Sequence, residues 1–276
     1  MQLIEEIKVD VRTDFRPSAL MVNTGVYQES ESSTESGVRY LEDSYIPKDD
    51  WVIANSETTD RLTLNVNNYK KHSKIVLGKI PDEIKDLFVG LDFSNSKNKQ
   101  EAFQKLADNP ETTLEIERKL NKYLGKYNSE NKFQLYKLLV LYPNRQTTAF
   151  INFDDGIKYI GMHFDSSTSF EIETAHTSQN RFCLNLGLED RELYFVNLSL
   201  PKCKELILEK NSSEIVSLKT ITPLFFKYYP NYPIIKLKIR PFEYYIAPTD
   251  NCIHEGTTLR KSEMDISITY LGDFNT

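Results

Sequence analysis

The sequence predicts an α+β protein that is mostly β, with a jelly-roll core and a helical segment packed against it. Short apolar runs separated by turn signals fill the second half of the chain, a pattern typical of sandwiches and jelly rolls. The middle of the chain shows a helical period instead. With 276 residues, 39% of them hydrophobic, the chain can bury a substantial core, and we expect a single domain, residues 1–276.

Residues 1–80 predict an irregular N-terminal part with short strands. Apolar residues alternate over residues 4–11, and residues 51–53 and 62–66 are further strand candidates. Residues 28–37 are rich in serine and glutamate, which favours a mobile loop over packed structure. Such a loop is either solvated or a lid over a pocket.

Residues 81–142 predict a helical scaffold. Pro81 opens the first helix with two acidic residues beside it, as expected for a helix N-terminus. We expect further helices over residues 99–107, from Pro110 onward, and over residues 131–141. These helices should pack against the sheet that follows.

Residues 143–276 are expected to form the jelly-roll core. Asp154-Asp155-Gly156 is a hairpin turn signal. The chain contains no G-x-G-x-x-G, Walker-type or G-x-S-x-G motif, so nucleotide-binding and serine-hydrolase functions lack their signatures. The predicted strands span residues 147–153, 157–165, 181–188, 193–200, 234–239, 244–247 and 266–271.

Composition narrows the functional class further. The net charge is −6 and no dense basic patch offsets it, which argues against a nucleic-acid partner. No apolar run reaches the roughly 20 residues that cross a membrane, and the acidic start of the chain lacks a leader's basic and apolar regions. Cys183, Cys203 and Cys252 suggest neither a disulfide framework nor a zinc ribbon. We expect a reduced cytoplasmic protein; the oligomeric state is not predicted.

His163 and Asp165 form the candidate centre of the chain. Residues i and i+2 of a strand point to the same face, so both side chains could reach one metal ion. His254, after a late strand, would supply a second imidazole. Two histidines and one carboxylate are typical of non-haem Fe(II) oxygenases. The alternatives are an ordinary hydrogen bond between His163 and Asp165, and a loop histidine satisfied by Asp250 or Asn251.

The order His163-Phe164-Asp165, then His254, then a closing strand with Ser267 resembles the Fe(II)/2-oxoglutarate-dependent dioxygenases of the double-stranded β-helix superfamily. The resemblance covers roughly residues 145–272. It implies iron held by His163, Asp165 and His254, with 2-oxoglutarate as cosubstrate. It also implies hydroxylation, or another oxidation, of a substrate with release of succinate and CO2.

The distal carboxylate of the cosubstrate needs a cation. Many members of the superfamily carry an R-x-S arrangement on the closing strand, but Asp265-Ile266-Ser267 stands there in this chain. Arg181 and Arg260 are the substitutes, and Arg181 is preferred because Arg181, Cys183 and Asn185 would form a polar inner face of their strand. A surface ion pair is the alternative for either arginine. Tyr159 should face the same side as His163, as a donor to 2-oxoglutarate or as a core tyrosine.

The expected substrate is a small molecule, an amino acid or a peptide-derived metabolite. Residues 28–60, 166–180 and 201–233 are expected to select it, the last through the aromatic run from Phe225 to Tyr232. Two other functions stay open: a metal-dependent cupin-type enzyme that does not use 2-oxoglutarate, and a non-enzymatic β-sandwich binding module.

Overall fold

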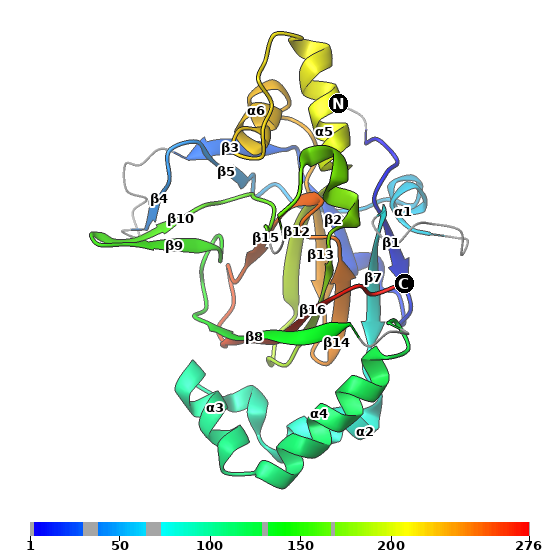
Figure 1. Ribbon diagram of the computed structural model, residues 1–276, viewed down its shortest axis with the longest axis vertical. Helices are drawn as coiled ribbons and strands as arrows, with labels where there is room; N and C mark the ends of the chain where they lie inside the picture. The colour runs from blue at the N-terminus through cyan, green and yellow to red at the C-terminus, as the bar shows by residue number, and fades with distance from the viewer. Residues whose placement is uncertain (1–2, 30–37, 65–72, 129–131, 167–168, 276) are drawn as a thin grey trace.

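A computed structural model describes residues 3–29, 38–64, 73–128, 132–166 and 169–275. The protein is α+β: two large sheets face each other at the centre, and helical layers lie at opposite ends of the molecule (Figure 1). Most of the predicted lid over residues 28–37 lies outside the described residues.

The first large sheet has six strands and is antiparallel except between its first two members. Its order is β1 (Lys8–Val11), β7 (Lys74–Lys79), β14 (Glu243–Ala247), β11 (Asn180–Asn185), β16 (Asp265–Gly272) and β8 (Phe133–Leu141).

The second large sheet has five strands. Its order is β15 (Cys252–Thr257), β12 (Arg191–Ser199), β13 (Ile235–Ile239), β2 (Leu20–Val22) and β6 (Val52–Ile53). From β11 to β16 the chain passes back and forth between the two sheets. Their facing sides share one apolar cluster, to which Cys183 and Tyr245 belong on the first sheet and Leu193 and Phe195 on the second.

Two smaller sheets complete the β structure. One joins β4 (Arg39–Tyr40), β10 (Gly156–Tyr159) and β9 (Phe150–Phe153), and the other pairs β3 (Val26–Glu29) with β5 (Ser44–Pro47). The predicted turn between β9 and β10 is confirmed, and the hairpin projects from the side of the molecule (Figure 1).

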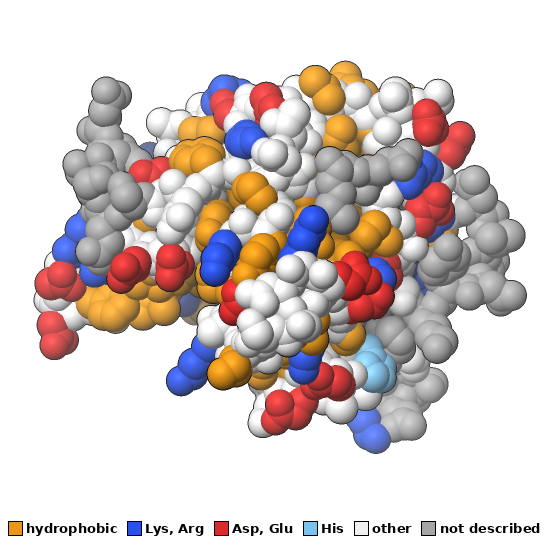
Figure 2. Space-filling model, turned by 90° about the horizontal axis from the view of Figure 1, so that it is seen from above, with side chains coloured by type: hydrophobic (Ala, Val, Ile, Leu, Met, Phe, Trp, Pro, Cys, Tyr) orange, Lys and Arg blue, Asp and Glu red, His pale blue; other side chains and the backbone are white. Residues whose placement is uncertain are grey.

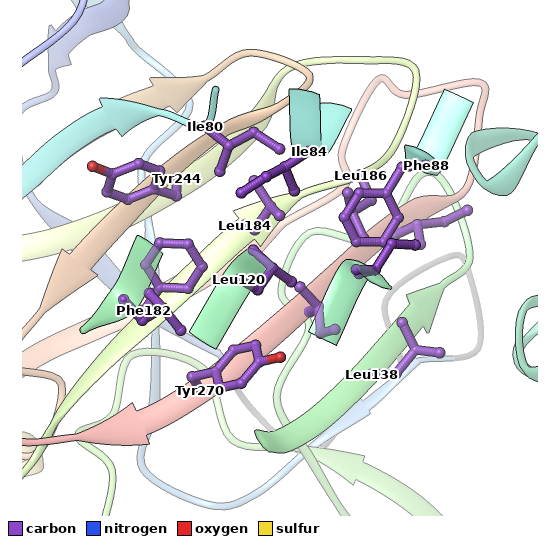
Figure 3. Packing of buried hydrophobic residues seen from close by; sticks show 14 of the residues in the cluster. Ile80, Ile84, Phe88, Leu120, Leu138, Phe182, Leu184, Leu186, Tyr244 and Tyr270 are labelled. Atoms are coloured by element: carbon purple, nitrogen blue, oxygen red, sulfur yellow. The ribbon is translucent and has the colours of Figure 1, made fainter. Parts of the chain in front are cut away.

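The helices that were predicted to open at Pro81, Lys99 and Pro110 are confirmed. They are α2 (Asp82–Gly90), α3 (Lys99–Ala107) and α4 (Pro110–Leu124). They cover the outer face of the six-stranded sheet, where Phe88 and Leu120 pack with Phe182 and Tyr244 (Figure 3). This apolar layer confirms that the even-numbered residues of β11 face the helices.

The remaining helical segments are short or lie on the other large sheet. Helices α5 (Leu200–Lys210) and α6 (Ile221–Tyr228) pack against the outer face of β12. The others are α1 (Ser56–Leu62), η1 (Pro17–Ala19), η3 (Phe93–Asn95) and η4 (Ile172–Thr177). Across the described residues, no helix is long and apolar enough to span a membrane. On the face seen in Figure 2, basic and acidic side chains are interspersed.

The fourth predicted helix is wrong. Residues 133–141 form strand β8, which pairs along its length with β16 at the edge of the six-stranded sheet. Apolar residues fall on both faces of this run, so periodicity alone does not separate strand from helix. Pairing with β16 decides the conformation, because it satisfies the backbone groups of an otherwise open sheet edge.

Two further strand predictions need correction. Residues 56–62 form α1, and Asn55 caps its first turn by accepting from the Thr58 N–H at 2.8 Å. The strand predicted over residues 62–66 is therefore wrong at Leu62, which ends the helix, and residues 65 and 66 lie outside the described residues. The strand predicted over residues 157–165 stops at Tyr159. It stops because Gly161 adopts a left-handed backbone, φ +65°, which breaks the alternation.

Candidate metal centre

The three predicted ligands converge. The ligand atoms of His163, Asp165 and His254 all lie within 4.8 Å of one another. His254 Nε2 is 3.3 Å from Asp165 Oδ2, and His163 Nε2 is 4.0 Å from Asp165 Oδ1. Within the described ranges, this is the one cluster of three or more His, Cys, Asp or Glu side chains that could hold a metal ion.

Backbone pairing brings the two histidines together. The His163 N–H donates to the His254 carbonyl at 3.0 Å, and the His254 N–H donates to the His163 carbonyl at 2.6 Å. Residues paired in this way place their side chains on the same face, and the two imidazole centroids are 4.8 Å apart. Asp165 is fixed by its N–H, which donates to the Thr249 carbonyl at 3.0 Å.

Both imidazoles are oriented by carbonyl groups at Nδ1. The Gly161 carbonyl lies 2.9 Å from His163 Nδ1, and the Cys252 carbonyl lies 3.2 Å from His254 Nδ1. These contacts assign the ring proton to Nδ1, which leaves both Nε2 lone pairs for a metal. Gly161 is required at its position, since a Cβ there would lie 2.6 Å from the Tyr45 carbonyl oxygen.

The protonation states at neutral pH suit a divalent metal. Burial, with the neighbouring His254, lowers the pKa of His163 to about 4. Burial alone would raise the pKa of Asp165, but His254 and Arg181 outweigh it and hold this pKa well below its usual range. The site therefore offers a neutral imidazole beside a carboxylate, the forms in which these groups bind metals.

A cavity of about 450 Å³ opens beside the centre, with Phe150, Ile160 and Phe164 among its apolar walls. Three basic side chains also line it: Lys137 from β8, Arg181 from β11 and Arg191 from β12. This volume lies within the usual range of small-molecule pockets.

The two arginines have carboxylate partners. Arg181 Nη1 lies 2.8 Å from Asp165 Oδ2. Arg191 Nη1 lies 2.8 and 2.7 Å from the two oxygens of Asp265, and it donates to Ser267 Oγ at 2.7 Å. The charge of each guanidinium is thus offset within the protein.

Lys137 differs from the arginines. In the part of the chain that the structure describes, no carboxylate lies within ion-pair distance of its ammonium group. Burial, reinforced by Arg181, lowers its pKa. Strand register places Lys137 opposite Thr269, Thr269 opposite Cys183, and Cys183 opposite Tyr245. These four residues form one row across the inner face, and all four line the cavity.

The other predicted site residues have mixed outcomes. Arg181 lies in the cavity as expected, but beside a candidate metal ligand. Arg260 does not line the cavity: its side chain is 73% exposed and pairs with Asp49. Tyr159 does not line the cavity either. The turn at Gly161 breaks the alternation between Tyr159 and His163, and the Tyr159 ring lies against Tyr40 and Phe150. Ser267 is buried and bonded to Arg191.

Among the residues described, the segments expected to select the substrate contribute little to the cavity wall. Of residues 28–60, 166–180 and 201–233, only Ser166 lines the cavity among the residues described. Phe225 and Phe226 are buried in the core against α5, and the Tyr232 hydroxyl donates to Asn197 Oδ1 at 2.8 Å. The predicted aromatic lining from this run is therefore wrong.

Sequence reasoning missed Lys137 and Arg191. Lys137 was hidden because its segment has an ambiguous apolar pattern that favoured a helix. Arg191 was detectable, since it alternates with Leu193 and Phe195, which are buried and apolar. An arginine on such a face needs a buried anionic partner.

No family of known sequences and no curated protein matches this chain. Among solved structures, the chain is similar to the apo structure of the Kdo hydroxylase KdoO, a non-heme Fe(II) alphaketoglutarate dependent dioxygenase. That alignment has 12% identity and a TM-score of 0.37, and it covers 73% of this chain and 80% of the other. The structure of the same hydroxylase with succinate and Fe(III) aligns at 13% identity and a TM-score of 0.33, over the same shares of both chains. Similarity at this level assigns no activity to the chain.

Proposed function

We propose that this protein is an Fe(II)- and 2-oxoglutarate-dependent oxygenase that hydroxylates, or otherwise oxidises, an amino acid or another small metabolite. One observation carries the proposal: two imidazoles and one carboxylate converge on the wall of a cavity that can hold small molecules. This donor set leaves coordination positions open for cosubstrate and oxygen. The passage of β11 to β16 between two facing sheets supports a double-stranded β-helix for the core.

The residues present fit the iron. His163, Asp165 and His254 would hold it, because their possible ligand atoms all lie within 4.8 Å of one another. Bound iron and 2-oxoglutarate together supply the oxidising chemistry, with succinate and CO2 as products. The protein orients the ligands through Gly161 and Cys252 and keeps them in a partly closed cavity.

Lys137 is our candidate for the anchor of the distal carboxylate. A partly buried ammonium without an anionic partner is unfavourable until an anion binds. The guanidinium groups of Arg181 and Arg191 are already offset by Asp165 and Asp265. The hydroxyl groups of Thr269 and Tyr245, in the same row as Lys137, add hydrogen-bond donors for a carboxylate.

Anaerobic titration of the metal-free protein with Fe(II), and then with 2-oxoglutarate, tests the proposal. We expect one Fe(II) per chain and a weak visible charge-transfer band when 2-oxoglutarate is added. His254→Ala should abolish both, while His176→Ala, on η4 away from the cavity, should retain both. Fe(II) uptake without the band would favour a metal-dependent enzyme that does not use 2-oxoglutarate. No uptake would favour a binding module.

A further inference from the structure

Glu255 is a buried carboxyl group that follows His254 on β15 and is only 1% exposed. One of its oxygens, Oε1, accepts from four donors. These are the Thr148 N–H at 3.2 Å, the Thr148 hydroxyl at 3.1 Å, the Ala149 N–H at 3.2 Å and the Gly256 N–H at 2.7 Å. Four converging donors fix the orientation of the carboxyl group.

The second oxygen, Oε2, lies beside His163. It is buried, has no hydrogen-bond partner among the described residues, and is 3.7 Å from His163 Nδ1. That nitrogen already has the Gly161 carbonyl at 2.9 Å, so a small tilt of the ring would let its N–H share the two acceptors. A buried acceptor without a donor is unfavourable, which favours this tilt.

We propose that Glu255 is a positioning residue, which holds His163 Nδ1 so that Nε2 faces the metal and ties this imidazole to the cavity wall at Thr148 and Ala149. The inference rests on the proposed metal centre. A carboxyl oxygen that accepts from the Nδ1–H of a metal-bound histidine fixes the tautomer and the orientation of the ring.

The local sequence supports the link to the wall. A Cβ at Gly256 would lie 2.7 Å from Thr148 Oγ1, so glycine lets the Thr148 segment approach β15 closely enough to reach Glu255. Phe150, two residues after Thr148, lines the cavity. Residues 148–150 therefore link the cavity to His163: Phe150 would contact a ligand, and Thr148 and Ala149 donate to Glu255, which lies beside the His163 ring.

Co(II) binding by Glu255→Gln tests the inference, with Co(II) absorption as the measure of affinity. We expect Co(II) to bind about 10–100-fold more weakly than to the wild-type protein. Glu243→Gln is the matched control: Glu243 is also buried, but its partners are Arg240 and Thr13, outside the cavity. Its Co(II) affinity should equal that of the wild type.

Nitrogen NMR of the His163 ring in the metal-free protein gives a second readout, which does not depend on metal. The wild type should show the Nδ1-protonated tautomer, and Glu255→Gln should show a mixture of tautomers. If Co(II) affinity and tautomer are both unchanged in Glu255→Gln, the role of Glu255 is overturned while the metal centre stands. If the wild type itself binds no Co(II), the proposed function fails instead.

Discussion

Arg181 and Asp165 form a buried ion pair at the edge of the candidate metal centre, with Arg181 Nη1 2.8 Å from Asp165 Oδ2. The guanidinium carbon also lies 4.9 Å from the centre of the Tyr136 ring. The arginine that the sequence suggested for the cosubstrate thus orients a candidate ligand of the metal.

Arg181→Gln should therefore weaken metal binding. Without the guanidinium, Asp165 loses its charged partner, and its pKa rises toward the usual range. We expect about tenfold weaker Co(II) binding, because removing a group that orients a metal ligand typically costs about 10–100-fold in metal affinity. Isothermal titration calorimetry measures the change, with Arg260→Gln as the control. If Arg181→Gln binds Co(II) like the wild type but no longer binds 2-oxoglutarate, Arg181 is the cation that anchors the distal carboxylate of 2-oxoglutarate.

Lys137→Ala should show the opposite selectivity. We expect Co(II) to bind as in the wild type, while 2-oxoglutarate binds the Co(II)-loaded protein about 10–100-fold more weakly, because one charge-assisted contact is lost. Arg260→Ala, which removes an exposed arginine outside the cavity, should bind 2-oxoglutarate normally. Equal affinity in Lys137→Ala and wild type would exclude Lys137 as the anchor.

The pH dependence of 2-oxoglutarate binding should reflect Lys137. Its pKa lies below the 10.5 of an exposed lysine, because of burial and then of Arg181. Only the protonated amine attracts a carboxylate, so affinity should be constant at low pH and fall as pH rises through this lowered pKa. Calorimetry between about pH 7 and 9.5 measures the fall. Lys137→Arg should remove it, because a guanidinium stays charged throughout; a fall that persists in this variant would assign it to another group.

Gly161→Ala should damage both stability and the metal centre. Alanine is strained at φ +65°, and its Cβ would meet the Tyr45 carbonyl at 2.6 Å. We expect a loss of about 1–3 kcal/mol in the free energy of unfolding, measured by urea denaturation, with weaker Co(II) binding. Gly90→Ala is the control, since a Cβ there meets nothing within 4 Å; it should leave Co(II) binding unchanged. A Gly161→Ala protein as stable as wild type would contradict the backbone requirement.

Phe182→Ala should affect stability alone. Phe182 is fully buried and contacts Tyr244, with ring centroids 4.6 Å apart, on the face of β11 that packs against the helices. The cavity that remains should cost about 3–5 kcal/mol in urea denaturation. Arg181 and Cys183 point to the other face, so folded Phe182→Ala should bind Co(II) like the wild type. Loss of Co(II) binding by the folded variant would show that the two faces are coupled.

The sequence predicted the features that depend on local pattern and on residue chemistry. Alternation along β11 placed Arg181 and Cys183 inside and Phe182 outside, and the chemistry of His163, Asp165 and His254 identified a cluster that the structure brings together. What it could not predict depends on pairing between distant segments. Residues 133–141 form a strand because they pair with β16. That pairing also places Lys137 in the cavity wall, which the local sequence does not indicate.

The ion pair of Arg191 with Asp265 also depends on distant segments. Asp265 stands where an arginine was expected, and Arg191 reaches it from the neighbouring sheet. Neither residue alone suggests this pairing, because residues 191 and 265 are far apart in the chain. Tyr159 was misplaced for a local reason, since one glycine in a left-handed conformation breaks the alternation on which the prediction depended.

The mutual backbone hydrogen bonds of His163 and His254 have a consequence for folding. These residues are distant in sequence, so their pairing carries a large loop-closure cost, and we expect it to form after the local contacts. A partly folded chain would present the imidazoles separately, with little affinity for a metal. Iron would then be bound after the sheets close, and it would stabilise the closed chain by mass action, with slower local opening of β15 as the result.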